Sequence, residues 1–169
     1  IGTSARRWQT GWFSSGIFLG SNQTDIFGVY EEGAVTPVLR GATTTGDALY
    51  DTGNRVGRYV RIGDEVFVTL QLAASAFTSA TGNLEISGMP FASTNAGNLR
   101  QSGTKGLASQ LVHRSGVVSI EPIIDENTAI VRFIDTISNA GAAYTTAGAV
   151  NASALANFQI ALSITYRTN

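Results

Sequence analysis

The stretch EGAVTPVLRGATTTGDALYDTGNRVGRYVRIG, residues 32–63, decides the fold, because it passes from a Gly/Thr-rich loop into an alternating apolar run. The run continues as DEVFVTLQLA, residues 64–73, in which Val and Leu alternate with other residues. Alternation with a period of two is typical of a strand with one buried face. Gly63 and Asp64 suit the hairpin turn between the two runs. The stretch therefore predicts paired strands over residues 55–62 and 65–72, with the valine and leucine face in the core.

The rest of the chain repeats this pattern of short strands and turns. Apolar alternation predicts strands over residues 105–114, 117–123, 128–135 and 158–167, and a further one around GNLEISGMPF, residues 82–91. Turns are expected at residues 51–54, 81–83, 115–116 and 125–127, and loops at 93–102 and 138–148. Residues 149–156 fit either a turn or a short helix. About eight strands without a long amphipathic helix predict an all-β fold, an antiparallel, jelly-roll-like β-sandwich.

Composition excludes several classes of protein. The net charge is −1, so no electrostatic footprint for nucleic acid or for an anionic membrane is present. The absence of Cys excludes disulfides and thiolate metal sites, and no apolar run reaches the length of a membrane span. Charged residues make up only 14% of the chain, which fits many short strands joined by small-residue turns and also fits a surface that is largely buried against copies of the chain.

Residues 1–31 differ from the rest of the chain, because large apolar side chains are dense there. Thirty residues cannot bury that much apolar area alone, so they need a partner surface. We predict a segment that packs against a partner surface over residues 1–31 and a β-sandwich head over residues 32–169, with a hinge at Glu31, Glu32 and Gly33. The large apolar side chains that would meet this partner surface are Trp8, Trp12, Phe13, Phe18 and Phe27. The alternative is a hairpin packed on the head. The opening Ile1-Gly2-Thr3 also suggests a fragment of a longer protein.

Two motifs carry a resemblance to the C-terminal modules of bacteriophage tail fibres and tailspikes. That family joins an entry segment to a pair of strands and then to a strand of the type G-x-L-x-I-x-G-L-P-F. The matching residues here are Thr36, Pro37, Leu39, Gly41, Tyr50, Gly57, Arg58, Tyr59, Arg61, Ile62, Gly63, Val66, Val68, Gly88, Met89, Pro90 and Phe91. Val35 and Met89 depart from the Trp and Leu that the family often has, and both replacements are apolar. Residues 2–8 also resemble a motif of fibre shafts. This resemblance implies that residues 1–31 form a stem or trimerisation segment, with trimer contacts at Trp8, Trp12, Phe13, Phe18 and Phe27.

The resemblance implies a homotrimer that sits on the virion tail and works outside the cell. Its implied role is adhesion to a bacterial surface polysaccharide, a lipopolysaccharide or an outer-membrane protein, with no nucleic acid and no membrane insertion. Three other readings stay open: a head-fibre or baseplate decoration that serves trimerisation, a monomeric carbohydrate-binding module, and a depolymerase with a body upstream.

The sequence gives little support for catalysis. A catalytic triad would need His113, an acid such as Asp125 or Asp135, and an exposed serine, and no nucleophile-elbow pattern is present. The acid pairs at residues 31–32, 64–65 and 125–126 are neighbours in expected turns, whereas a glycosidase needs carboxyls facing each other across a cleft. Adjacent Asp125, Glu126 and Asn127 favour a turn over a Ca²⁺ loop. We expect no enzyme activity, no cofactor and no metal.

Sugar recognition on a β-fold uses exposed aromatic rings together with Asn, Asp and Arg side chains. Loops that carry such residues include Phe77 with Asn83, and Asn95 with Arg100. Tyr144 is the aromatic residue that we most expect to be exposed, because small residues surround it. The candidate ligand-binding residues are Tyr144, Asn139, His113, Arg114, Asn95 and Asn98.

Overall fold

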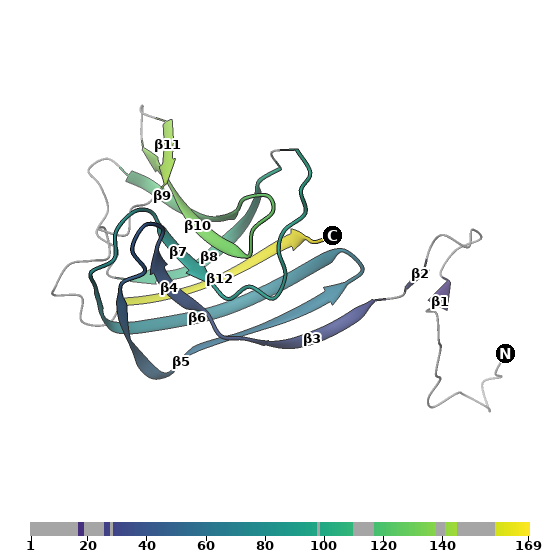
Figure 1. Cartoon of the computed structure of the whole chain (residues 1–169), viewed down its shortest axis with the longest axis horizontal. Coiled ribbons are helices and arrows are strands. Elements are labelled where there is room, and N and C mark those ends of the chain that lie inside the picture. Colours follow the sequence, from purple (N-terminus) through teal and green to yellow (C-terminus); the bar gives the residue numbers. More distant parts are fainter. Residues whose placement is uncertain are drawn as a thin grey trace.

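The computed structural model describes residues 17–18, 26–27, 29–97, 99–109, 117–137, 141–144 and 158–169. All regular structure in these ranges is β-strand (Figure 1). The strands are β1 Ile17–Phe18, β2 Ile26–Phe27, β3 Tyr30–Val35, β4 Val38–Gly41, β5 Asp47–Ile62, β6 Glu65–Thr78, β7 Leu84–Ser87, β8 Gln101–Ser109, β9 Val117–Ile124, β10 Ile130–Ile137, β11 Gly141–Tyr144 and β12 Phe158–Arg167. Within the described part of the chain, no helix is long and apolar enough to span a bilayer.

Ten of the strands form one antiparallel sheet in the order β3-β5-β6-β12-β8-β9-β10-β7-β4, with β11 paired to β10. β8 is the corner of this sheet, because its first two residues pair with β9 and the rest pair with β12. The sheet therefore has two parts: a long-strand half, β3-β5-β6-β12-β8, and a short-strand half, β9-β10-β7-β4 with β11. β1 and β2 form a separate two-stranded pair.

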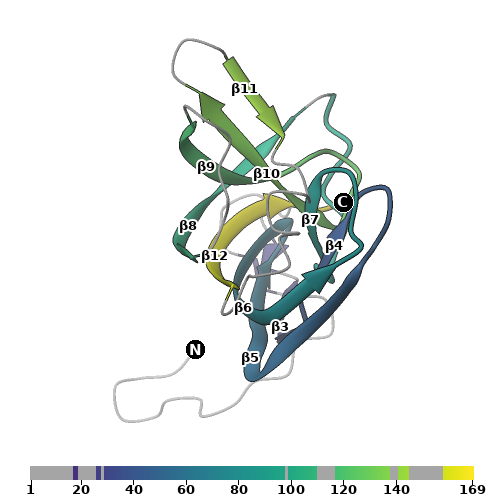
Figure 2. The same cartoon turned by 90° about the vertical axis from the view of Figure 1, so that its left-hand side faces the viewer.

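The sheet curls so that its two halves enclose one core. Figure 2 shows the strands following one another around an arc, from β5 through β6, β12 and β8 to β9 and β10. The two edge strands, β3 and β4, are consecutive in the chain and are joined only by Thr36 and Pro37. Arg55 of β5 donates to the carbonyl oxygen of Pro37 at 2.8 Å, and the Leu39 amide donates to the Tyr50 hydroxyl at 2.9 Å. These two hydrogen bonds hold the connection between the edge strands β3 and β4 against β5.

Alternation along the strands decides which side chains enter the core. Val66, Val68, Leu70 and Leu72 of β6 are all buried, as predicted for that face. β12 repeats the pattern opposite them, and the short-strand half contributes Leu39, Leu84, Ile86, Ile120, Ile124, Val131 and Phe133. Side chains between these positions point outward. An all-β antiparallel fold is therefore confirmed.

Several predicted elements match the structure and others do not. The β5–β6 hairpin turns at Gly63, whose φ is 60°, and β12 has the predicted bounds. The turn at residues 125–127 is present, with Asn127 at a φ of 53°. Residues 51–54 were expected to form a turn, but they belong to β5, whose pairing with β6 is irregular between Tyr50 and Arg55.

The predicted hinge at Glu31, Glu32 and Gly33 is wrong, because these residues belong to β3 and pair with Arg61, Val60 and Tyr59 of β5. The division into residues 1–31 and 32–169 stays a prediction, and its boundary falls inside β3. In the expected stem, β1 and β2 pair with each other, with Phe18 opposite Ile26 and Ile17 opposite Phe27. Trp8, Trp12 and Phe13 lie outside the described residues.

Candidate functional site

The outward face of the long-strand half carries a straight row of side chains across five strands. Register places Ala34 of β3 opposite Arg58 of β5, and Arg58 opposite Thr69 of β6. Ser163 of β12 lies opposite Thr69 and also opposite Thr104 of β8. Four of these five positions hold small side chains, so the surface is recessed along this row.

A groove of about 850 Å³ runs along this recessed row of small side chains. Its walls are the longer side chains of the rows on either side, with Val60 and Glu32 in one and Val56 and Gln71 in the other. The side chains and backbone that line it belong to Glu32, Gly33, Ala34, Val56, Gly57, Arg58, Tyr59, Val60, Thr69, Leu70, Gln71, Thr104, Gly106, Ala161, Leu162 and Ser163. A volume of this size accommodates a small ligand or a few sugar residues.

The chemistry of the groove is that of a neutral hydrogen-bonding surface. Thr69, Thr104 and Ser163 each offer a hydroxyl that both donates and accepts, and all three are aligned across neighbouring strands. Arg58 adds a planar donor array, and among the described residues it has no ion-pair partner. The side-chain amide of Gln71 donates to Asn54 at 3.2 Å. Hydroxyl-rich ligands match this mixture of donors and acceptors.

The groove ends at the edge strand β3, which aromatic contacts hold on β5. The hydroxyl of Tyr59 donates to Glu31 at 2.6 Å, and this hydrogen bond raises the pKa of Tyr59. A side chain at Gly33 would lie 2.6 Å from the Tyr59 ring, so only glycine leaves room for this ring. Tyr59 also meets Phe91 edge to face at a centroid distance of 5.6 Å. Arg61 covers the Phe91 ring at 4.8 Å.

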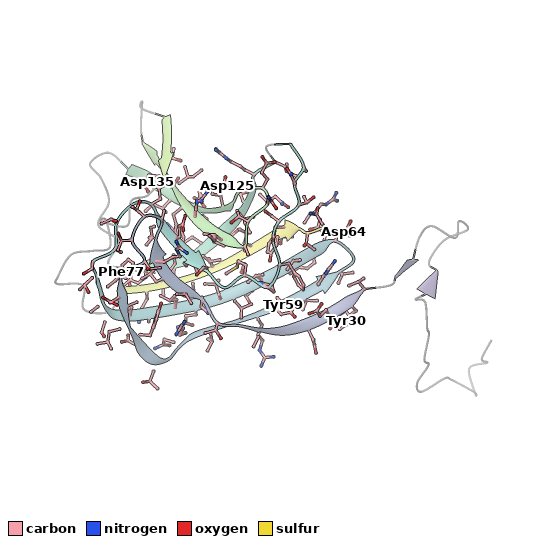
Figure 3. All side chains as sticks on the ribbon, viewed as in Figure 1. Tyr30, Tyr59, Asp64, Phe77, Asp125 and Asp135 are labelled. Atoms are coloured by element: carbon pink, nitrogen blue, oxygen red, sulfur yellow. The ribbon has the colours of Figure 1, made fainter. Side chains whose placement is uncertain are left out.

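Tyr30, the first residue of β3, is on the outward face next to the groove. Its hydroxyl donates to Glu32 at 3.0 Å, and this bond raises the pKa of Tyr30. Figure 3 places Tyr30 at the end of the sheet where β3 begins, and Phe77 near the opposite end. Tyr30 therefore marks the end of the outward face that adjoins the predicted stem.

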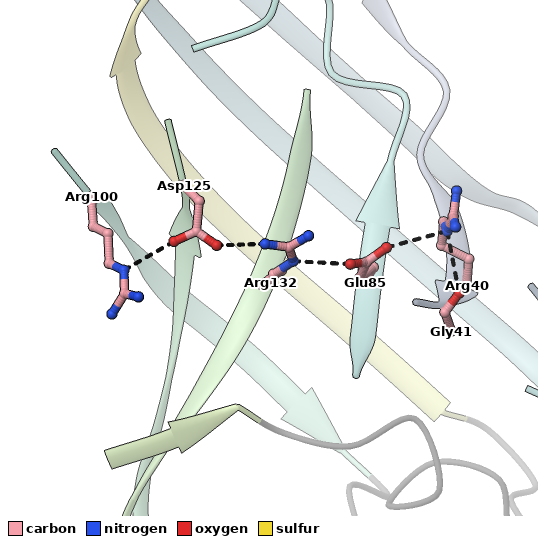
Figure 4. A network of polar contacts seen from close by, with 6 residues as sticks. All are labelled: Arg40, Gly41, Glu85, Arg100, Asp125 and Arg132. Atoms are coloured by element: carbon pink, nitrogen blue, oxygen red, sulfur yellow. Dashed lines mark hydrogen bonds and ion pairs between the residues drawn. The ribbon is translucent and has the colours of Figure 1, made fainter. Parts of the chain in front are cut away.

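A second polar feature, a ladder of alternating charges, lies on the outward face of the short-strand half (Figure 4). Glu85 of β7 lies between Arg40 of β4, at 3.3 Å, and Arg132 of β10, at 2.9 Å. Asp125 continues the ladder, with Arg132 at 2.6 Å and Arg100 at 3.0 Å. Burial alone lowers the pKa of Arg132, but hydrogen bonds to Glu85 and Asp125 outweigh it, and the net shift is upward. Each acid is held by two guanidinium groups, so we interpret the ladder as a clamp across strands.

The structure tests only some of the sequence-predicted ligand residues. Asn95 is exposed in the segment before β8. Tyr144 was expected in a loop, but it is the last residue of β11, where it pairs with Ile134, and its side chain is outside the described residues. Asn139, His113, Arg114 and Asn98 also lie outside them. Phe77 is wrong as an exposed sugar platform, because its side chain is buried in the core. Arg100 is engaged by Asp125.

Sequence reasoning missed both the groove and the ladder. The groove residues come from five strands, and only the register brings them into one row. A signal for the ladder was available, since Arg40, Glu85 and Arg132 each interrupt an otherwise apolar strand. Charged residues at equivalent strand positions predict cross-strand pairs.

Comparison with known proteins finds a likeness among solved structures. No family model matches the sequence, and no curated protein matches it. Among solved structures, the crystal structure of the Dettilon tailspike protein (gp208) is similar over 80% of this chain, with a TM-score of 0.59 and 18% identity. The chain spans 23% of that protein's length. The likeness concerns the fold, and this chain is therefore tailspike-like in fold.

Proposed function

We propose that this chain is the distal, receptor-binding part of a phage tail fibre or tailspike, and that its outward groove binds a bacterial surface glycan. The observation that carries the proposal is the groove itself, with its row of Thr69, Ser163 and Thr104 hydroxyls beside the Arg58 guanidinium. The fold likeness to a tailspike segment supports the same role. The location would be the virion tail, outside the cell.

We further propose that three chains assemble, with a stem in residues 1–31 and a β-sandwich head in residues 32–169. The support is the low share of charged residues and the density of large apolar side chains in the stem. Three identical grooves on one particle would raise avidity for a repeated glycan even if each groove binds weakly. Adhesion to a polysaccharide coat requires this multivalency more than high affinity at one site.

The proposal includes no catalytic step. In the described part of the chain, both acids of the ladder are engaged by arginines, Glu31 accepts from Tyr59, and Glu32 accepts from Tyr30. Within the groove, Glu32 is the one carboxyl-bearing residue among those that line it. A pair of facing carboxyls, which glycosidic hydrolysis uses, is not formed by the groove-lining residues.

The first experiment measures binding of the purified chain to immobilised lipopolysaccharides and capsular polysaccharides of defined repeat structure. We expect saturable binding to one repeat type. Ser163→Leu fills the floor of the groove, so we expect it to weaken binding by about tenfold or more. Ser102→Leu is the matched control, because Ser102 is an exposed serine on β8 that does not line the groove.

Two further readouts separate the proposal from its rivals. Asn95→Ala tests the sequence-predicted loop site. Loss of binding in this variant with normal binding in Ser163→Leu would contradict the assignment of the groove as the binding site. Release of new reducing ends from a bound glycan would contradict the non-catalytic reading and favour a depolymerase. Adhesion would be contradicted if the chain bound none of the glycans and also did not bind intact cells of the strains that supplied them.

A further inference from the structure

Eight large apolar side chains of the described residues are exposed, and more than half of them share one face. The eight are Val29, Tyr30, Leu49, Val56, Ile62, Phe67, Leu99 and Leu107. Strand register places five of the eight, Tyr30, Val56, Ile62, Phe67 and Leu107, on the outward face of the long-strand half. Solvated faces of antiparallel sheets normally carry polar residues, so this concentration points to a covered surface.

The densest part of this face is its end near the β5–β6 turn. Tyr30 of β3 lies directly opposite Ile62 of β5, and Phe67 of β6 lies opposite Val60 in the next row. Their exposed fractions are 57% for Tyr30, 41% for Ile62 and 46% for Phe67. We call these three residues the apolar patch.

We infer that the apolar patch is a contact surface for a second copy of this chain, and that the groove opens beside this contact. The inference rests on the proposed trimer and adds the face by which the heads meet. The groove lies farther along the same strands, where the row of Ala34, Arg58 and Thr69 follows that of Val60 and Phe67. A contact at the patch would therefore leave the groove accessible at the boundary between subunits.

The charges around the patch favour a copy of the same chain over other occupants. Around the patch, Glu32 and Glu65 are balanced by Arg58 and Arg167, so the charges at these strand positions cancel. Glu65 already pairs with Arg167 at 3.1 Å, and Glu32 accepts from Tyr30. A neutral surface does not attract nucleic acid or anionic lipid, whereas it is compatible with another copy of this chain, whose net charge is only −1.

The position of the apolar patch next to the predicted stem gives a second reason to expect a copy of the same chain as its partner. Tyr30 is both the first residue of β3 and a member of the patch, so the chain enters the head at this surface. If residues 1–31 form a trimeric stem, neighbouring heads are closest where each chain leaves that stem. In a three-fold ring each contact is heterologous, so the patch would meet a different surface of its neighbour.

The test is the native mass of the full chain by light scattering, for the unchanged protein and for Ile62→Glu and Phe67→Glu. We expect a trimer for the unchanged protein and a shift toward monomer for both variants, with retained β-sheet circular dichroism. Leu99→Glu is the matched control, because Leu99 is 44% exposed and lies outside the strands that form this face. We expect it to remain a trimer.

A second measurement does not depend on how well a charged variant folds. The chain has no Cys, so Phe67→Cys and Leu99→Cys each introduce a single reactive thiol. We expect maleimide to label the Phe67→Cys protein at least about tenfold more slowly than the Leu99→Cys protein, because a subunit contact would cover the first site. Equal labelling rates would overturn the inference.

The remaining outcomes separate this inference from the proposed function. A trimer whose mass is unchanged by Ile62→Glu and Phe67→Glu overturns the patch and leaves the trimer standing. A monomeric unchanged protein overturns both the patch and the trimer, while glycan binding still tests adhesion. A monomer in which the Phe67→Cys thiol becomes reactive only after removal of residues 1–28 identifies that segment as the occupant and overturns the inference.

Discussion

Glu85 and Arg132 occupy paired positions on β7 and β10, and their side chains meet at 2.9 Å with the Glu85 carboxylate almost fully buried. Arg132 also holds Asp125, so one guanidinium links two acids across the outward face of the short-strand half. Arg40 of β4 forms a second ion pair with Glu85, on the side of Glu85 opposite Arg132. These contacts join strands that are far apart in sequence, and the stability of this half should depend on them.

Arg132→Met should destabilise the fold by about 2–3 kcal/mol, because it leaves the buried Glu85 carboxylate with one partner instead of two. Urea unfolding followed by circular dichroism measures the change. Arg167→Met is the matched control, since the Arg167–Glu65 pair is largely exposed and should contribute less than about 1 kcal/mol. Equal losses in the two variants would contradict the role given to the ladder.

Adjacent positions on β6 should respond oppositely to truncation, because one faces the core and the next faces solvent. Leu72 is fully buried, so Leu72→Ala should cost about 2–4 kcal/mol. Gln71 is exposed and bonds only Asn54 among the described residues, so Gln71→Ala should cost less than about 0.5 kcal/mol. Denaturant midpoints for the two proteins provide the measurement, and a cost for Gln71→Ala as large as that for Leu72→Ala would mean that the face assignment is wrong.

The success with β6 and β12 shows what alternation alone predicts. Both strands alternate large apolar residues with polar ones, so their faces and the bounds of β12 are evident from the sequence. The same alternation predicted that this strand ends at Leu72, whereas β6 continues to Thr78. Residues 73–78 are mostly small, and Ala73 and Ala74 are buried although small side chains give a weak periodic signal.

Other features depend on contacts that no local pattern contains. Residues 51–54 look like a turn by composition, yet they lie inside β5, at an irregularity between two segments that pair with β6, and Gly53 has a φ of 83°. Glu31 and Glu32 look like a solvated hinge, yet tyrosine hydroxyls bond both carboxylates within a strand. The groove is set by register across five strands, and a one-residue slip would turn its side chains inward.

Tyr166 should make stability depend on pH in the alkaline range. Its hydroxyl is buried and donates to the Phe91 carbonyl at 3.0 Å, and burial raises its pKa to about 12. In the unfolded chain a tyrosine ionises near pH ~10. The stabilising effect is therefore complete below about pH 10 and is lost as pH rises toward about 12, by up to about 2 kcal/mol.

Tyr166→Phe removes this titrating group, so its unfolding free energy should fall less steeply over the same alkaline interval. The measurement is urea unfolding of both proteins at a series of pH values from about 9 to about 11.5. Tyr30 and Tyr59, whose pKa values are also raised, are present in both proteins and cancel in the comparison. Parallel pH profiles would contradict the assignment to Tyr166.

Gly41 should resist any substitution, because the carbonyl oxygens of Thr81 and Thr44 lie where a side chain would begin. These are backbone atoms and cannot move aside alone. Gly41→Ala should therefore cost about 2–3 kcal/mol. Gly106→Ala is the control, because the nearest atom to a new side chain there is 3.7 Å away. Thermal unfolding of both variants checks the prediction, which fails if Gly41→Ala is as stable as Gly106→Ala.

The place of β12 in the sheet has a consequence for biosynthesis. β12 follows every other described strand in the chain, yet it lies between β6 and β8 and pairs with both. A ribosome-bound chain that has not yet exposed residues 158–167 must therefore hold open the hydrogen-bonding edges of β6 and β8. Such edges readily pair with other chains. We expect nascent chains truncated before residue 158 to require a chaperone, and the last strand to complete the sheet.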